Sequence, residues 1–143
     1  MAGIRPAEVE SPRYEQLDAW RYADDLAVDV YRLTRRLAPD LRPVVSQILR
    51  AAISVPANIA EGYGRGSDRE FLQFLTIANA SLYEVTYFLH FLQRIDAISA
   101  EAHRKAAADC SRNSRVLFGL MKSIRGGSGR VANRRYLSGN SKG

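Results

Sequence analysis

The sequence predicts an all-α protein, an up-down-up-down antiparallel four-helix bundle. In four long segments, apolar residues recur at every third or fourth position, which is the spacing of one helix face. Connections of only about three to five residues join these segments, and short connections favour antiparallel neighbours. The 143 residues suit a single domain. We place the bundle at residues 14–125, after a flexible N-terminus at residues 1–13.

The first two helices are expected from about Leu17 to Leu37 and from about Pro43 to Tyr63. The predicted inner face of the first helix contains Trp20, Ala23, Ala27, Val30, Tyr31, Thr34 and Leu37. The apolar side of the second helix contains Ile48, Ala52, Val55, Pro56, Ile59 and Tyr63. Because this pattern continues through Pro56, the sequence predicts one helix that is kinked there rather than two helices.

The third and fourth helices have recognisable N-terminal caps. Ser67 and Glu70 form a capping box, in which the Ser67 hydroxyl accepts from the Glu70 amide and the Glu70 carboxylate returns to Ser67. The third helix is expected to continue to about Arg94. Ser99 is a good N-cap for the fourth helix, which two glycines stop after Arg125.

The third helix carries more apolar surface than one bundle seam requires. Its heptad seam consists of Phe71, Ala78, Val85 and Leu92 with Phe74/Leu75, Ser81/Leu82 and Phe88/Leu89. A second apolar set lies off this seam: Ile77, Tyr83, Tyr87 and Phe91. We expect these residues to form an oligomer interface, although the bundle alone could also cover them. Polar residues recur throughout residues 71–93, so a buried helix is favoured over a membrane span.

A polar strip about 80° wide follows the second helix, opposite its apolar side. Its members are Arg50, Ser54, Asn58, Glu61 and Arg65. Arg65 follows Glu61 by four residues, which suits an ion pair. Three interpretations stay open: a solvated face, a polar network buried at a helix or subunit contact, and a ligand site. Periodicity does not separate them.

The net charge of +6 is unevenly distributed. Residues 1–103 hold 11 basic and 14 acidic side chains, whereas residues 104–143 hold 10 basic and 1 acidic. Such a basic block is typical of proteins that contact nucleic acid, and also of solvated tails. The candidate contacts are Arg104, Lys105, Arg112, Arg115, Lys122 and Arg125 on the fourth helix, and Arg130, Arg134 and Arg135 in the tail. The tail, residues 126–143, is rich in Gly, Ser and Arg and is expected to be disordered.

No pattern of catalytic or metal-binding residues stands out, so we expect a protein that is not an enzyme and holds no cofactor or metal. His90 and His103 are interpreted as core groups, because neither follows the Glu-x-x-His spacing of bundle di-iron sites. Cys110 is interpreted as an inert thiol. The stretch GYGRGS at residues 62–67 lacks the spacing and lysine of a P-loop. A helix end followed by a helix start explains it better than an anion site.

Residues 50–67 read RAAISVPANIAEGYGRGS, and residues 70–85 read EFLQFLTIANASLYEV. Together with residues 17–39, these segments resemble the ribosomal-RNA intervening-sequence protein family, also called four helix bundle proteins. The resemblance implies a small cytoplasmic bacterial protein and suggests a homopentamer. Some members of the family are encoded inside insertions in 23S ribosomal RNA genes. Similar accessory proteins of diversity-generating retroelements bind a reverse transcriptase, and bind nucleic acid through a basic surface.

We therefore expect an oligomeric helical scaffold that contacts RNA through its basic fourth helix and tail. Such contacts with phosphates depend steeply on salt and weakly on sequence. The alternative is a protein-interaction module, which docks a reverse transcriptase or another protein and does not bind nucleic acid. In that case the polar strip or the third helix would be the docking surface.

Overall fold

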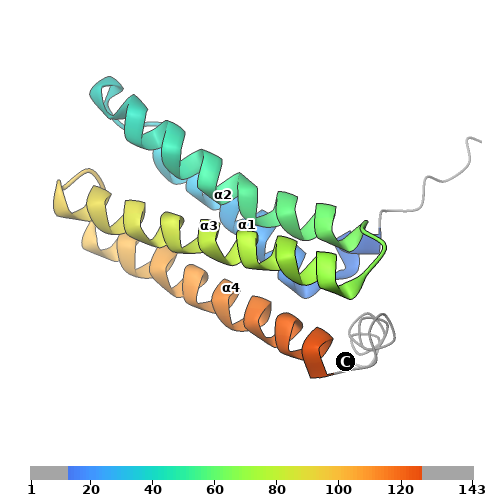
Figure 1. Ribbon diagram of the computed structural model, residues 1–143. Helices are drawn as coiled ribbons and strands as arrows, with labels where there is room; N and C mark the ends of the chain where they lie inside the picture. Colours follow the sequence, from blue (N-terminus) through green and yellow to red (C-terminus); the bar gives the residue numbers. More distant parts are fainter. Residues whose placement is uncertain (1–12, 127–143) are drawn as a thin grey trace, which may run out of the picture.

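The computed structural model describes residues 13–126, and these residues form four long helices with no β-strand among them (Figure 1). The predictions for the N-terminal dozen residues and for the tail beyond Gly126 lie outside this range. The elements are, in chain order, the 3-10 turn η1 (Arg13–Gln16), α1 (Asp18–Thr34), the 3-10 turn η2 (Pro39–Leu41), α2 (Arg42–Tyr63), α3 (Asp68–Arg94) and α4 (Ala100–Gly126).

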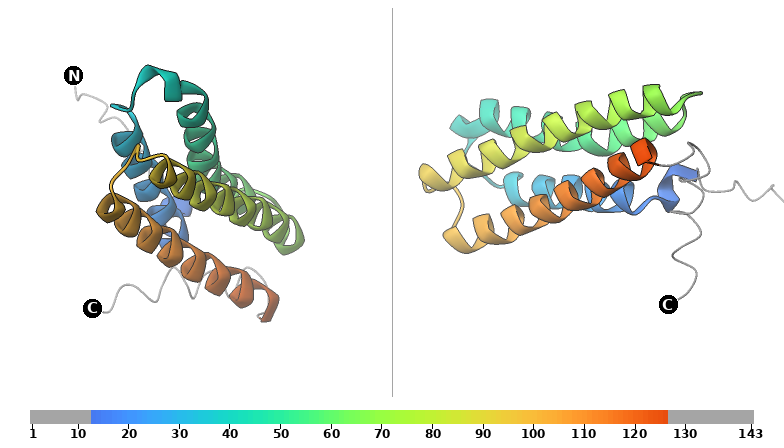
Figure 2. Two further views of the ribbon diagram at one scale, coloured as in Figure 1. Left: turned by 90° about the vertical axis from the view of Figure 1, so that its left-hand side faces the viewer. Right: turned by 60° about the horizontal axis from the view of Figure 1, so that its bottom comes forward.

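The four helices form the predicted antiparallel bundle. α3 packs on α2 and α4, and α1 packs on the same two helices from the other side, so sequence neighbours are also neighbours in space (Figures 1 and 2). The chain reverses direction at each short connection, as an up-down-up-down topology requires. The predicted fold class is confirmed.

The predicted caps begin α3 and α4. The Ser67 hydroxyl accepts a hydrogen bond of 3.2 Å from the Glu70 amide, and the Ser99 hydroxyl accepts one of 3.0 Å from the Ala102 amide. At the other end of α3, Asp96 adopts a left-handed conformation with φ of 58°. The amides of Asp96 and Ala97 then bond the carbonyls of Gln93 and Leu92, which ends the helix in a Schellman motif.

α2 is one helix that continues through Pro56, as its unbroken apolar pattern predicted. Proline lacks an N–H, so the carbonyl of Ala52 receives no helical bond from it. The helix persists because its apolar side is anchored in the core: Ile48, Ala52, Val55 and Ile59 are each at most 1% exposed. Burial of these side chains outweighs the loss of one backbone hydrogen bond.

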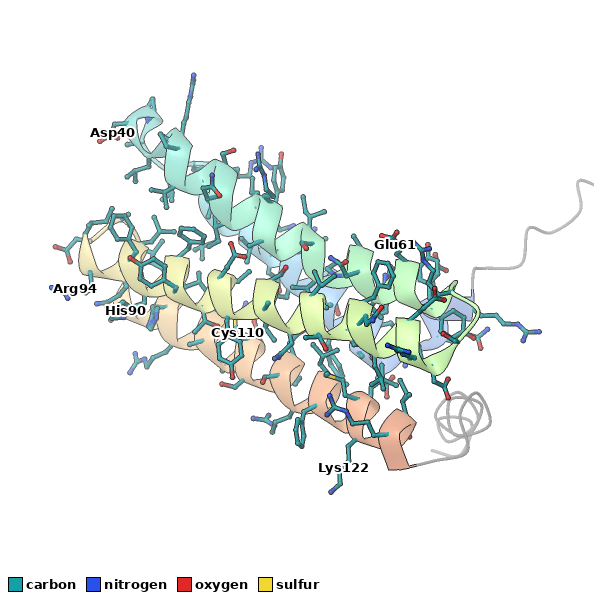
Figure 3. The ribbon with its side chains drawn as sticks, in the orientation of Figure 1. Asp40, Glu61, His90, Arg94, Cys110 and Lys122 are labelled. Carbon is teal, nitrogen blue, oxygen red and sulfur yellow. The ribbon has the colours of Figure 1, made fainter. Side chains whose placement is uncertain are left out.

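The centre of the core is the heptad seam of α3. Leu75, Ala78, Val85 and Leu92 are fully buried, and they meet the inner faces of the other three helices. Two expectations from the sequence are wrong. Tyr31 is 50% exposed, since it lies at the edge of the apolar face of α1, next to buried Val30. His90 is exposed on the outer side of α3 rather than in the core (Figure 3).

α2 and α3 approach each other closely at Gly62. A Cβ atom at Gly62 would lie 2.6 Å from the Cβ of Phe74 and 2.9 Å from the ring of Phe71. The lack of a side chain therefore lets the end of α2 pack directly on the first turns of α3. This glycine is required by a close approach of two helices, and not by a phosphate loop.

We predict that Gly62→Ala lowers the free energy of unfolding. Overpacking against α3 costs about 1–3 kcal/mol, which exceeds the gain in helix propensity of about 1 kcal/mol. Urea denaturation followed by circular dichroism measures the difference. Gly64→Ala is the matched control, because its added methyl would meet the nearest atoms at 3.5 and 3.8 Å, an ordinary contact distance. An unchanged or higher stability of Gly62→Ala would contradict the close approach.

Candidate nucleic-acid interface

The basic side chains of α4 are all exposed, as a contact with phosphates requires. They are Arg104, Lys105, Arg112, Arg115, Lys122 and Arg125. Among the described residues, none of them forms an ion pair. Their charges are therefore not neutralised within the bundle and are available to a partner.

Four of these residues form one line along the outer face of α4, which we call the basic stripe: Arg104, Arg115, Lys122 and Arg125. The first three are separated by eleven and seven residues, or about three and two helical turns. At 1.5 Å per residue the stripe is about 31 Å long. Lys122 points away from the bundle near the end of the helix (Figure 3).

No carboxylate lies between the members of this stripe, and Glu101 precedes it in the first turn of α4. Asp109 is the one acidic residue of α4 beyond the first turn, and it faces grooves that α4 forms with α1. Lys105 and Arg112 line these same grooves, and the Arg112 guanidinium stacks over the Tyr22 ring at 5.4 Å. The structure thus divides the six predicted cations into four on the outer stripe and two beside α1.

Phe118 is exposed by 62% in the middle of the basic stripe, three residues after Arg115 and four before Lys122. Phe118 is not among the residues predicted from the sequence. A helical wheel of α4 would have revealed it, because an aromatic residue at i+3 from Arg115 shares its face. Tyr83 of α3 is 68% exposed and faces Phe118 across a shallow groove. Arg115 and Arg125 line the same groove from α4.

The remaining members of the expected apolar interface lie along the outer side of α3. Ile77 is 49% exposed and Tyr87 is 59% exposed, whereas Phe91 is partly buried. The bundle therefore does not cover this side by itself. Tyr83 lines the groove against α4, and Ile77 lies about 120° around the helix from it.

The polar strip of α2 divides into a partly buried middle and solvated ends. The Ser54 and Ser81 hydroxyls are 2.9 Å apart and join α2 to α3. The Asn58 amide donates to the Ser54 carbonyl and hydroxyl at 2.8 and 2.9 Å. Arg50 is exposed, and exposed Glu61 and Arg65 form an ion pair of 3.0 Å. The middle residues thus belong to a helix contact.

Arg65 also lies over the Phe74 ring, 4.9 Å from its centre. In Figure 3, Glu61 lies on α2 and Lys122 lies on α4, on opposite sides of α3. The polar strip and the basic stripe are therefore separate surfaces. Of these two surfaces, the basic stripe is the one that carries an exposed aromatic ring, Phe118, between cations that form no ion pair among the described residues.

Cys110 is buried between the helices and is 4% exposed. Burial raises its pKa from 9.0 to about 11, a hydrogen bond with the Thr86 side chain lowers the pKa, and the negative charge of Asp109 raises it. The thiolate is the reactive form, so a raised pKa leaves the thiol unreactive near neutral pH. This agrees with the expected inert thiol.

Within residues 13–126, no group of three or more His, Cys, Asp or Glu side chains is arranged to hold a metal ion. None of the helices of this segment is long and apolar enough to cross a membrane. The fold and the surface define the class of protein: a small helical bundle whose last helix presents a basic outer face.

The chain belongs to the 23S rRNA-intervening sequence protein family, whose sequence profile matches residues 15–119. The fold is similar to the crystal structure of a Bacteroides thetaiotaomicron protein, which is described as a protein with unknown function from the S23 ribosomal protein family. The two chains share 26% identity with a TM-score of 0.68, over 73% of this chain and 95% of the other. No curated protein matches the chain.

Cys110 predicts a loss of stability at alkaline pH. The folded chain holds the thiol proton more tightly than the unfolded chain, so stability is complete below pH 9 and falls as the pH rises to about 11. The expected loss is on the order of 2 kcal/mol. Urea unfolding at pH 8 and pH 11 measures it, and Cys110→Ala should lose less than the parent chain. Equal losses in both proteins would refute the raised pKa.

Proposed function

We propose that this protein is a non-enzymatic, oligomeric helical scaffold that contacts RNA through the basic stripe of α4. The observation that carries the proposal is the stripe itself: four exposed cations, none in an ion pair among the described residues, with no carboxylate among them. When such cations bind phosphates, they release the counterions that were condensed on the nucleic acid, and this release favours binding to any polyanion. The tail cations Arg130, Arg134 and Arg135 would extend this contact.

Membership of the family supports RNA as the polyanion, because the family is described by its relation to 23S rRNA intervening sequences. The geometry supports a contact that is weakly sequence-specific. Arginine and lysine side chains on an exposed helix bind phosphates, and phosphate contacts position a nucleic acid without reading its bases. We further propose that the protein is cytoplasmic, where it meets RNA.

Oligomerisation through the outer side of α3 completes the proposal. Ile77 and Tyr87 are large apolar side chains that remain about half exposed in one chain. Large exposed apolar side chains favour contact with another protein surface, and identical chains most often assemble with closed symmetry. The family resemblance suggests five subunits. In this arrangement the basic stripes of several subunits can bind one RNA molecule. The overall affinity then exceeds that of a single stripe, although each stripe makes the same contacts as before.

We predict binding to a labelled single-stranded RNA that weakens steeply with salt. Four phosphate contacts to a single strand give a slope of log K against log salt of about −3, and the three tail arginines would add about −2. Arg115→Gln should reduce the slope by about 0.7 and leave the fold unchanged. Fluorescence anisotropy between 50 and 200 mM salt measures these slopes.

Arg50→Gln is the control for this titration, because Arg50 is an exposed arginine on the polar strip of α2. Its slope should equal that of the parent chain. An RNA affinity that is undetectable at 50 mM salt, or that does not vary with salt, would contradict RNA contact. The protein-interaction module would then be the better account, and a partner such as a reverse transcriptase would be sought.

We predict that light scattering finds an assembly of several 16.0 kDa chains, with five expected. Ile77→Glu should lower the measured mass, because it places a charge in the proposed subunit contact. Ile53→Glu is the matched control, since Ile53 is also an exposed isoleucine, at 56%, but lies on α2. A monomeric parent chain, or equal effects of the two variants, would contradict the proposed interface.

A further inference from the structure

A shallow groove lies between α3 and α4, beside the basic stripe. Its volume is about 390 Å³, within the range of small-ligand sites. α3 contributes Asn79 and Tyr83, and α4 contributes Ser114, Arg115, Phe118 and Arg125. The groove therefore combines two aromatic rings, two guanidinium groups and two polar side chains.

The two rings of the groove are largely exposed. Tyr83 is 68% exposed and Phe118 is 62% exposed, so each presents a face to solvent instead of packing in the core. Neither ring stacks on another aromatic residue or under a cation within the described chain. Aromatic faces of this kind are the surfaces on which unpaired bases stack.

The polar groups around the rings suit the rest of a nucleotide. Arg115 and Arg125 make no ion pair among the described residues, and no carboxylate lines the groove. Their charge favours an anion such as a phosphate. Within the same part of the chain, the Asn79 amide and the Ser114 hydroxyl make no hydrogen bond to another group, so both are free to meet a base edge.

We propose that this groove binds an unpaired nucleotide of RNA, with its base stacked on Phe118 or Tyr83 and its phosphate on Arg115 and Arg125. The inference rests on the proposed RNA contact and adds a substrate class to it: single-stranded rather than duplex RNA. Bases in a duplex are stacked on each other and cannot reach an aromatic side chain, whereas bases in loops and single strands can. The continuous basic stripe then follows the flanking phosphates.

Charge favours a nucleotide over a second copy of the chain as the occupant of the groove. The groove is lined by Arg115 and Arg125 and by no carboxylate, so it attracts an anion such as a phosphate. An apolar subunit contact is better served by Ile77, which lies on another side of α3.

The test uses the full-length chain with a labelled 12-nucleotide single strand and with a duplex of the same sequence, at one fixed salt concentration. The single strand should bind more tightly than the duplex. Phe118→Ala should weaken single-strand binding about fivefold to 100-fold, which corresponds to the loss of one base–aromatic stack, and should leave duplex binding unchanged. Phe118→Trp, which keeps an aromatic ring, should retain the affinity.

Tyr31→Ala is the matched control, because Tyr31 is an exposed aromatic residue on α1 and its loss should not alter binding. If RNA binds but Phe118→Ala equals the parent chain, or the duplex binds as tightly as the single strand, the nucleotide site is overturned while the RNA contact stands. If Phe118→Ala lowers the mass measured by light scattering, the groove is a subunit contact and the inference fails. Absence of all RNA binding overturns both.

Discussion

The close contact between α2 and α3 is the constraint on which the rest of the structure depends. Gly62 allows the end of α2 to lie against Phe71 and Phe74, and the Ser54–Ser81 hydrogen bond joins the middle of the two helices. The contact fixes the rotation of α3, because the face that carries Phe71 must turn toward α2. The seam through Leu75 and Val85 is then directed into the core.

Once α3 is fixed, the surface of the molecule follows. α4 packs its apolar side, including Leu117 and Leu120, on the remaining part of the core, so its charged side must face outward. Asn113 sets the position of α4 against α1, since its amide donates to the Tyr22 carbonyl at 3.2 Å. The core thereby determines where the basic stripe lies, and the groove with Tyr83 forms at the edge where α3 and α4 meet.

The sequence predicted the bundle well because its signals are local. Periodicity, the caps at Ser67 and Ser99, and the short connections each specify a helix or its end without knowledge of the partner helix. The role of the polar strip was not predictable, because whether Ser54 meets solvent or Ser81 depends on how two helices pack. His90 was misplaced for the same reason, because its exposure depends on how the assembled bundle packs, whereas the position of Phe118 beside Arg115 could have been read from a helical wheel of α4.

The most direct test of the account is to map where RNA touches the chain. A single strand that contains 4-thiouridine, crosslinked by ultraviolet light to the full-length protein, identifies the contacting residues by mass spectrometry of the peptides. The account predicts crosslinks in α4 between Arg104 and Arg125, centred on Phe118, and at Tyr83 of α3. Crosslinks concentrated on the polar strip of α2, or spread evenly over all four helices, would contradict it.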